Sequence, residues 1–169
     1  MKEFLPILVA LVIIAWLIAK SSKYQRSNPA STASPSRSLP RARQAPAPAY
    51  TWPSIGDFDF DVVGESYYQP AISALAGEHG DDGADLHTTA LLVPDNDNPY
   101  DDKAVRVDIR GLTVGHLSRD NARSFRRRLA QKKLGTAPTQ CDALIMGGFV
   151  LQDGQRADYG VRLDIRPFD

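Results

Sequence analysis

Hydrophobic and polar positions alternate along several short stretches after residue 55, which is the pattern of β-strands with one buried face. In residues 104–109, Val105, Val107 and Ile109 alternate with charged side chains. Gly111 follows and offers a tight turn into LTVGHL, so these two stretches predict a hairpin. Strands are expected in DFDFDVVGES up to Gly64, HTTALLVP, 104–109, LTVGHL, CDALIMGG and DYGVRLDI.

Two segments show helical spacing instead. In YYQPAISALAG, Ile72 and Leu75 share one helical face. Pro70 suits the first turn of a helix, and Gly77 is a typical stop. A short helix is therefore predicted here, followed by a polar loop in EHGDDGAD.

The second helical segment is SRDNARSFRRRLAQKKLG. Ser118 is a good N-cap, and Gly135 lies where a helix commonly ends. Ala122, Phe125 and Leu129 fall on one apolar stripe. The other face is basic and carries Arg119, Arg123, Arg126, Arg127, Arg128, Lys132 and Lys133.

These elements occupy residues 55–169, a length that supports one hydrophobic core. We expect a mainly β domain of the α+β class, a small, partly open barrel of five to six strands with two short helices.

The first 54 residues have a different composition. Residues 4–19 are apolar and suit one membrane-spanning helix, so residues 1–20 are predicted to be an uncleaved transmembrane anchor. A cleaved signal peptide is the alternative, but no small-x-small cleavage site follows the apolar run. Residues 21–54 are rich in serine and proline and contain no acidic residue, which predicts a disordered linker.

Charge is distributed unevenly along the chain. The 20 basic and 20 acidic residues cancel overall, but residues 1–54 have seven basic residues against one acidic, which leaves a net −6 for residues 55–169. More basic residues follow the apolar run than precede it, so a single-pass membrane protein with a cytoplasmic C-terminal domain is expected. Cys141 is the only cysteine, which excludes an internal disulfide and fits a reducing compartment.

The polar residues do not indicate an enzyme. The acidic stretch DNDNPYDD, residues 95–102, does not match a calcium-binding loop, because Tyr100 and Arg106 occupy the positions that need glycine and glutamate. The three histidines and Cys141 lack the short paired spacings of zinc sites, and no nucleophile elbow or P-loop is present. We expect no catalytic residue, no metal and no cofactor; a small metal-dependent hydrolase is a minor alternative.

Nucleic-acid binding has more support. A basic helix can neutralise phosphates, although a solvated helix face that pairs with the domain's aspartates is the competing interpretation. Tyr67, Tyr68 and Tyr100 lie in connections, where rings face solvent more readily than in strands. Bases that stack on such rings gain about 1 to 3 kcal/mol each. One of the two adjacent tyrosines is expected in the core, because neighbouring side chains point in different directions.

Three blocks resemble the successive motifs of the HIRAN family. They are VVGESYY, LVPDNDNPYDDKAVRVDI and VGHLSRDNA, and the resemblance spans residues 58–165. It implies an OB-like barrel. Members of the family stand at the N-terminus of helicase-like DNA translocases and capture the 3′ end of single-stranded DNA. The same partner is therefore implied here, and a separate helicase or nuclease is a further candidate.

The resemblance also implies roles for particular residues. Tyr67 and Tyr100 would stack on the terminal bases, and Asn98 and Asp101 would contact the terminal nucleotide. Asp101 would accept a hydrogen bond from the 3′-hydroxyl, and its charge would repel an internal phosphodiester. The complete expected set is Tyr67, Tyr68, Asn98, Tyr100, Asp101, His116, Arg119 and Arg123.

His116 and Arg119 are implied to hold a backbone phosphate. Ser66, however, stands where members of the family tend to have a basic residue. This difference motivates an alternative, a protein-interaction or scaffold module on the same barrel. The ATP hydrolysis of the translocases and any zinc belong to other domains, so the main expectation is a non-catalytic, membrane-tethered module for single-stranded DNA.

Overall fold

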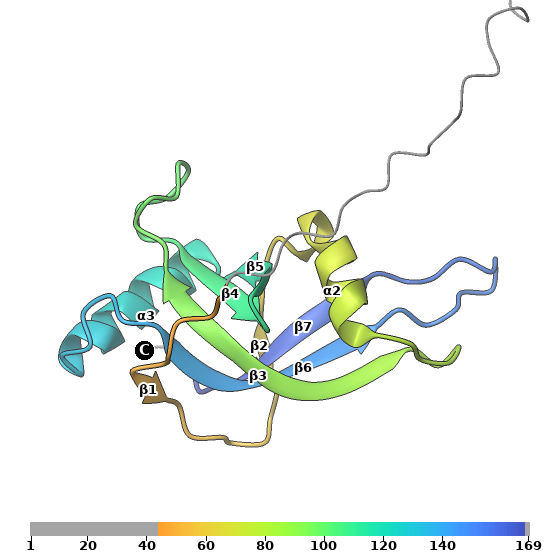
Figure 1. Ribbon diagram of the computed structural model, residues 1–169, viewed down its shortest axis with the longest axis horizontal. Coiled ribbons are helices and arrows are strands. Elements are labelled where there is room, and N and C mark those ends of the chain that lie inside the picture. The colour runs from red at the N-terminus through yellow and green to blue at the C-terminus, as the bar shows by residue number, and fades with distance from the viewer. Residues whose placement is uncertain (1–43, 168–169) are drawn as a thin grey trace, which may run out of the picture. The chain divides into compact units, whose positions relative to one another are not determined.

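A curled sheet organises residues 44–167, the part of the chain that the computed structural model describes (Figure 1). Its strands follow the order β2 (Phe60–Asp61), β7 (Tyr159–Asp164), β6 (Thr139–Gly147), β3 (Ala84–Pro94), β4 (Val105–Ile109) and β5 (Leu112–His116). A further two-residue strand, β1 (Tyr50–Thr51), pairs in parallel with β6. The expected mainly β class and partly open barrel are confirmed.

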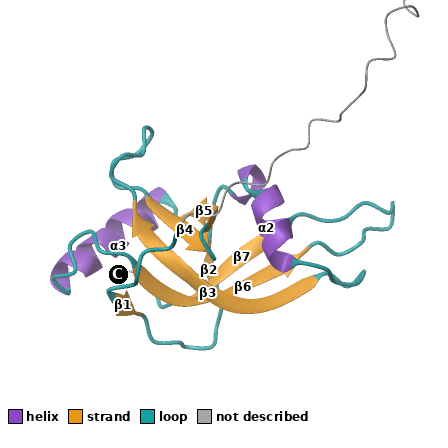
Figure 2. Cartoon of the chain, viewed as in Figure 1, coloured by secondary structure: helices purple, strands orange, loops and turns teal. Residues whose placement is uncertain are grey.

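Within residues 44–167, two α-helices accompany the sheet, and they lie at opposite ends of it in the view of Figure 2. They are α2 (Gln69–Ala76), which follows the short 3-10 helix η1 (Glu65–Tyr67), and α3 (Arg119–Gln131). Both predicted helices are confirmed, although α3 ends at Gln131, four residues before Gly135. Gly77 caps the end of α2, and the Ser118 side chain accepts a hydrogen bond from the Asn121 N–H at the start of α3.

The core lies between the sheet and both helices, and it includes Ile72 and Leu75 of α2. Phe125 and Leu129 of α3 are fully buried, as the helical stripe predicts. In β6, buried residues alternate with partly exposed ones, in agreement with the expected period of two. The long antiparallel ladder between β3 and β6 runs from Ala84 opposite Gly147 to Leu92 opposite Thr139 and forms the centre of the sheet.

The β4–β5 hairpin explains two glycines of the sequence. Arg110 and Gly111 both have positive φ, 48° and 80°, which is the pattern of a type I′ turn. Gly115 lies where a Cβ atom would meet the side chain of Val62 and come within 2.8 Å of the Val63 carbonyl oxygen. The backbone of Val63 pairs with His116 beside it, so the glycine permits this close approach.

Two strand boundaries differ from the prediction. DFDFDVVGES forms only the two-residue β2 and a single bridge at Val63, because Phe58 and Gly64 take positive φ angles of 46° and 82° that interrupt extended backbone. Conversely, the predicted loop EHGDDGAD ends early. Ala84 and Asp85 already belong to β3, since the long partner strand β6 extends the ladder into this polar stretch.

The predicted linker also ends earlier than expected. Residues 50–54 were assigned to it, yet Tyr50 and Thr51 form β1 and Trp52 is only 7% exposed. The Trp52 indole N–H donates to the Thr139 hydroxyl at 2.9 Å. The prediction was wrong here because it counted aliphatic residues and gave no weight to the two aromatic rings.

A buried carboxylate secures the segment after β1. Asp164 accepts hydrogen bonds from the Ser54 hydroxyl and from the backbone N–H groups of Ile55 and Gly56. Burial alone raises the pKa of a carboxyl group, but these donors outweigh it and lower the pKa of Asp164 below its usual value.

The predicted transmembrane anchor, residues 1–20, lies outside the described residues and stays a prediction. Within residues 44–167, no helix is both long and apolar enough to cross a membrane.

Candidate nucleic-acid interface

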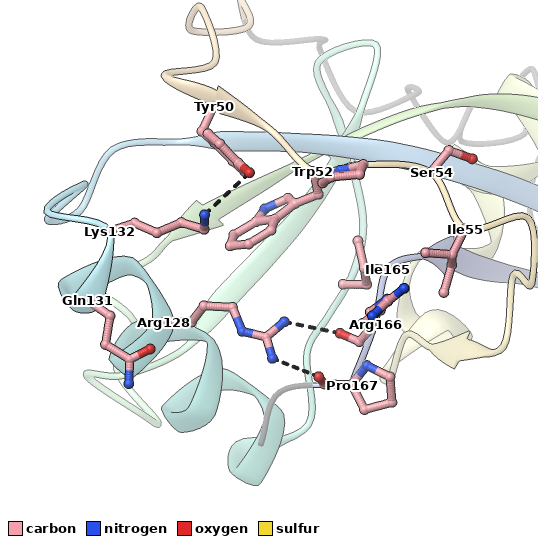
Figure 3. Close-up of a pocket in the computed structure, with 11 residues that line it drawn as sticks. Tyr50, Trp52, Ser54, Ile55, Arg128, Gln131, Lys132, Ile165, Arg166 and Pro167 are labelled. Carbon is pink, nitrogen blue, oxygen red and sulfur yellow. Dashed lines mark hydrogen bonds between the residues drawn. The ribbon is translucent and has the colours of Figure 1, made fainter.

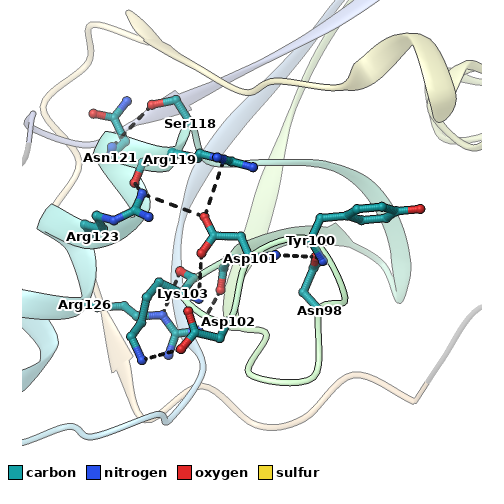
Figure 4. A network of polar contacts seen from close by, with 11 residues as sticks. Asn98, Tyr100, Asp101, Asp102, Lys103, Ser118, Arg119, Asn121, Arg123 and Arg126 are labelled. Carbon is teal, nitrogen blue, oxygen red and sulfur yellow. Dashed lines mark hydrogen bonds and ion pairs between the residues drawn. The ribbon is translucent and has the colours of Figure 1, made fainter.

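The loop between β3 and β4 presents Tyr100 at its tip. The side-chain oxygen of Asn98 accepts hydrogen bonds from the backbone N–H of Tyr100 at 3.0 Å and of Asp101 at 3.3 Å. This turn is typical of asparagine in loops, and it leaves the Tyr100 side chain 87% exposed (Figure 4). Asn98 therefore shapes the loop that holds the ring, a role that the sequence did not suggest.

Arg126 of α3 holds the base of the same loop. Its guanidinium donates to the carbonyl oxygens of Lys103 at 2.9 Å and Ala104 at 2.7 Å, and to the side-chain oxygen of Asn96 at 2.6 Å (Figure 4). The sequence placed Arg126 among the cations available to phosphate. The structure instead uses it as a structural link between α3 and the loop.

Asp101 lies between the loop and the start of α3. One carboxylate oxygen accepts from the Lys103 N–H at 2.9 Å, and the other is 3.9 Å from Nε of Arg119 and 3.8 Å from Nη1 of Arg123. The Asp101 side chain is 12% exposed, whereas Arg119 and Arg123 are 72% and 46% exposed. A hydrogen-bond acceptor and two solvent-facing cations thus share one small surface (Figure 4).

The segment that carries Tyr67 and Tyr68 is attached to β7. The Glu65 carboxylate accepts from the Val161 N–H at 2.5 Å, and the Gln69 amide makes two 2.8 Å hydrogen bonds with the backbone of Tyr159. Tyr67 is 87% exposed, while Tyr68 is half-buried and packs against the core. One of the two rings was expected in the core, and Tyr68 meets this expectation in part, because it packs against the core but is not fully buried.

His116 ends β5, and its ring centroid lies 6.0 Å from that of Tyr68. Burial lowers the pKa of His116, and neighbouring Arg106 lowers it further, although Asp95 and Asp108 oppose the shift. At neutral pH the ring is therefore uncharged. It can donate an N–H to a phosphate, but it adds no positive charge.

Arg106 was missed by the sequence analysis, which placed it on the solvent face of its strand. Its side chain is 20% exposed, and its Nε lies 2.9 and 3.0 Å from the carboxylate oxygens of Asp108, which is itself buried. Its Nη1 is 3.8 Å from Asp95 at the base of the loop. Opposite His116 in the β4–β5 ladder, Arg106 connects the His116–Tyr68 contact with the loop.

The expected site residues therefore form two groups. One group surrounds a single surface and consists of Asn98, Tyr100, Asp101, Arg119 and Arg123. The other group is Tyr68 and His116, which are in contact beside the Arg106 ion pairs. Tyr67 contributes a second exposed ring, from η1. What this arrangement offers chemically is aromatic surface, cations and one carboxylate acceptor.

Potential metal ligands and the single thiol can be located among the described residues. Among residues 44–167, no three His, Cys, Asp or Glu side chains are grouped so as to hold a metal ion. Cys141 is buried, and burial raises the pKa of its thiol far above the usual value, so the reactive thiolate is disfavoured.

Comparisons with known proteins bear on the family. The profile of the HIRAN domain matches residues 55–139, half of the chain. The crystal structure of the HIRAN domain of human HLTF aligns over 62% of this chain and 71% of that one, with 22% identity and a TM-score of 0.30, too low to support a conclusion. The 4-dimethylallyltryptophan N-methyltransferase easF of Aspergillus fumigatus is 54% identical over 35 residues, 21% of this chain but only 10% of that protein, so no activity is transferred.

Proposed function

The chain belongs to the HIRAN family, whose domains are DNA-binding modules, and we propose that its folded domain binds single-stranded DNA at a free 3′ end without catalysing a reaction. One observation carries the proposal. The loop carries the exposed ring of Tyr100 and, as its next residue, Asp101, whose carboxylate faces two exposed arginines.

The ring supplies affinity without base preference. Tyr100 is 87% exposed and the Asn98 turn fixes the backbone beneath it, so little order has to be created when a base stacks on it. A base stacked on an aromatic side chain is worth about 1 to 3 kcal/mol. Tyr67, equally exposed, offers a second ring of the same kind.

The carboxylate supplies selectivity for an end. A 3′-hydroxyl can donate to the oxygen of Asp101 that faces Arg119 and Arg123, while these arginines attract the phosphate on the 5′ side of the same nucleotide. A 3′-phosphate or an internal phosphodiester would instead bring like charge to the carboxylate. At 4 Å this repulsion is about 1 kcal/mol in water and about 4 kcal/mol near a protein surface, and the arginines reduce it.

Fluorescence anisotropy with a labelled oligothymidylate tests the proposal on the full chain, kept in a neutral detergent because of its apolar residues 4–19. We expect binding that weakens with salt. Tyr100→Ala should lower the affinity by about tenfold, whereas Tyr100→Phe, which keeps the ring, should retain it. Absence of binding at low salt would contradict the proposal, and so would equal losses in the two variants.

The apolar run and the basic residues that follow it support a further part of the proposal, a single-pass membrane protein with the DNA-binding domain in the cytoplasm. The chain should then stay with membranes after alkaline carbonate washing. A protease added to sealed, right-side-out vesicles should leave the domain intact. Release by carbonate, or digestion of the domain in intact vesicles, would contradict the tether or its orientation.

A second candidate function is protein binding, and the connection between β6 and β7 favours it. Phe149, Val150 and Leu151 are 46%, 37% and 41% exposed, an unusual run of apolar surface for a turn. Phe149→Ser should leave DNA binding unchanged if the site lies at Tyr100. Loss of DNA binding in this variant would indicate that the DNA-binding interface includes the connection between β6 and β7.

A further inference from the structure

A hollow of about 720 Å³ opens at the C-terminal end of α3 (Figure 3). Its walls come from β1 and the segment after it, from the last turn of α3, and from the residues that follow β7. Its volume falls within the range of about 300 to 1,000 Å³ that small-molecule sites occupy. Nothing in the proposed 3′-end site uses it.

Aromatic rings and cations line this hollow together. The rings of Tyr50 and Trp52 are 4.9 Å apart in an edge-to-face arrangement. The ammonium of Lys132 lies 4.6 Å from the centroid of Tyr50 and 5.6 Å from that of Trp52, and the guanidinium carbon of Arg128 lies 5.9 Å from Trp52. Arg166 also lines the hollow, so the described lining residues include three cations, and none of them carries a carboxylate.

The walls are held in place before any ligand arrives. Trp52 is fixed by its hydrogen bond to Thr139, and the segment after it is fixed by the buried Asp164 carboxylate. Arg128 donates to the carbonyl oxygen of Pro167 at 2.8 Å and thereby joins α3 to the residues after β7 (Figure 3). A preformed site of this kind avoids the entropy loss of ordering its walls on binding.

A planar heterocycle joined to a phosphate matches such a lining, because a base can stack on the partly exposed ring of Tyr50 and cations attract phosphate. We propose that the hollow is a second subsite for an internal nucleotide of the DNA strand whose 3′ end lies at Asp101. This inference rests on the proposed function. It places an anion-attracting, aromatic site at the other end of the helix that carries Arg119 and Arg123.

The distance between the two sites sets the length of DNA needed. The 13 residues of α3 span about 20 Å at 1.5 Å per residue. At about 3.4 Å per nucleotide, roughly six stacked nucleotides cover this distance. A trinucleotide therefore reaches only the 3′-end site, whereas a twelve-nucleotide strand reaches both.

The test compares these two oligothymidylates on the full chain, with Lys132→Gln and a matched control, Lys133→Gln, which removes a neighbouring cation that does not line the hollow. We expect the longer strand to bind more tightly. Lys132→Gln should weaken it about fivefold and lower its salt slope by about one, without changing binding of the trinucleotide. Lys133→Gln should have a smaller effect.

A second readout observes the hollow directly. In a Trp16→Phe background, Trp52 is the only tryptophan, and the longer strand should change its fluorescence whereas the trinucleotide should not. If the trinucleotide binds but added length gives no gain and Trp52 does not respond, the second subsite is refuted and the 3′-end function stands. If Lys132→Gln and Lys133→Gln weaken binding equally, the subsite is also refuted. If neither strand binds, both proposals fail.

Discussion

Arg126 provides a sharp test, because its two interpretations predict different results. As one cation of a basic helix, it would contact DNA phosphate. As the structure places it, it links α3 to the loop that presents Tyr100, through hydrogen bonds to Lys103, Ala104 and Asn96. We therefore expect Arg126→Ala to weaken DNA binding by loosening the loop and not by removing a phosphate contact.

The size of the effect follows from the three hydrogen bonds. Hydrogen bonds to a charged group contribute about 1.5 to 3 kcal/mol each, and partial exposure of Arg126 reduces this to about 1 kcal/mol each. Their loss takes about 3 kcal/mol from the ordered loop. The Asn98 turn remains, so only part of this energy appears in binding. Since 1.4 kcal/mol corresponds to tenfold, the affinity should fall between about tenfold and a hundredfold.

The assay is anisotropy with a 3′-hydroxyl oligonucleotide at several salt concentrations. Arg126→Ala should leave the slope of log affinity against log salt unchanged, while Arg119→Ala should lower it by about one. Arg127→Ala is the control, because Arg127 is exposed on the same helix and donates to Ser124 and not to the loop. If Arg126→Ala lowers the slope by one and costs no more affinity than Arg127→Ala, the structural role is refuted.

Three further predictions concern stability. Gly115→Ala should lower the free energy of unfolding by about 1 to 3 kcal/mol in a urea titration, because its Cβ would press on Val62 and Val63; an unchanged midpoint would contradict the close approach. The pKa of His116 is lowered in the fold, so the unfolded state binds more protons below pH about 6.5, and the free energy of unfolding should fall as the pH drops through that value. His116→Gln should flatten this pH dependence. An unaltered pH dependence in the variant would contradict the role of His116. The pKa of Asp164 is lowered in the fold, so its contribution to stability is present above pH about 4 and is lost as the pH falls through the folded pKa. Asp164→Asn should lower the free energy of unfolding by on the order of 3 kcal/mol at neutral pH and by little in acid. An equal loss at both pH values would refute this.

The sequence predicted the parts of the fold that depend on local spacing. The stripe of α3, its Ser118 cap and the turn at Gly111 are visible in a few neighbouring residues. Contacts between segments that are distant in the sequence could not be predicted from it. Nothing near Trp52 indicates that its indole binds Thr139, 87 positions later, so the start of the domain was placed too late.

The candidate site, too, could be predicted from the sequence only in part. The motif around Tyr100 and Asp101 could be recognised from its residues, and both lie in the expected loop. The partner of each cation could not be predicted, because an arginine on a helix surface can face solvent, phosphate or the protein's own carbonyl groups. Arg126 faces carbonyl groups, Arg106 faces two aspartates, and only the three-dimensional arrangement decides this.

The most direct test of the central claim compares two oligonucleotides that differ only at the 3′ terminus, one with a hydroxyl and one with a phosphate, on the full chain and on Asp101→Asn. The chain should bind the hydroxyl form at least several-fold more tightly. Asp101→Asn should reduce this difference by tolerating the phosphate, since the repelling charge is gone. Equal binding of the two oligonucleotides by the unaltered chain would contradict recognition of a 3′ end.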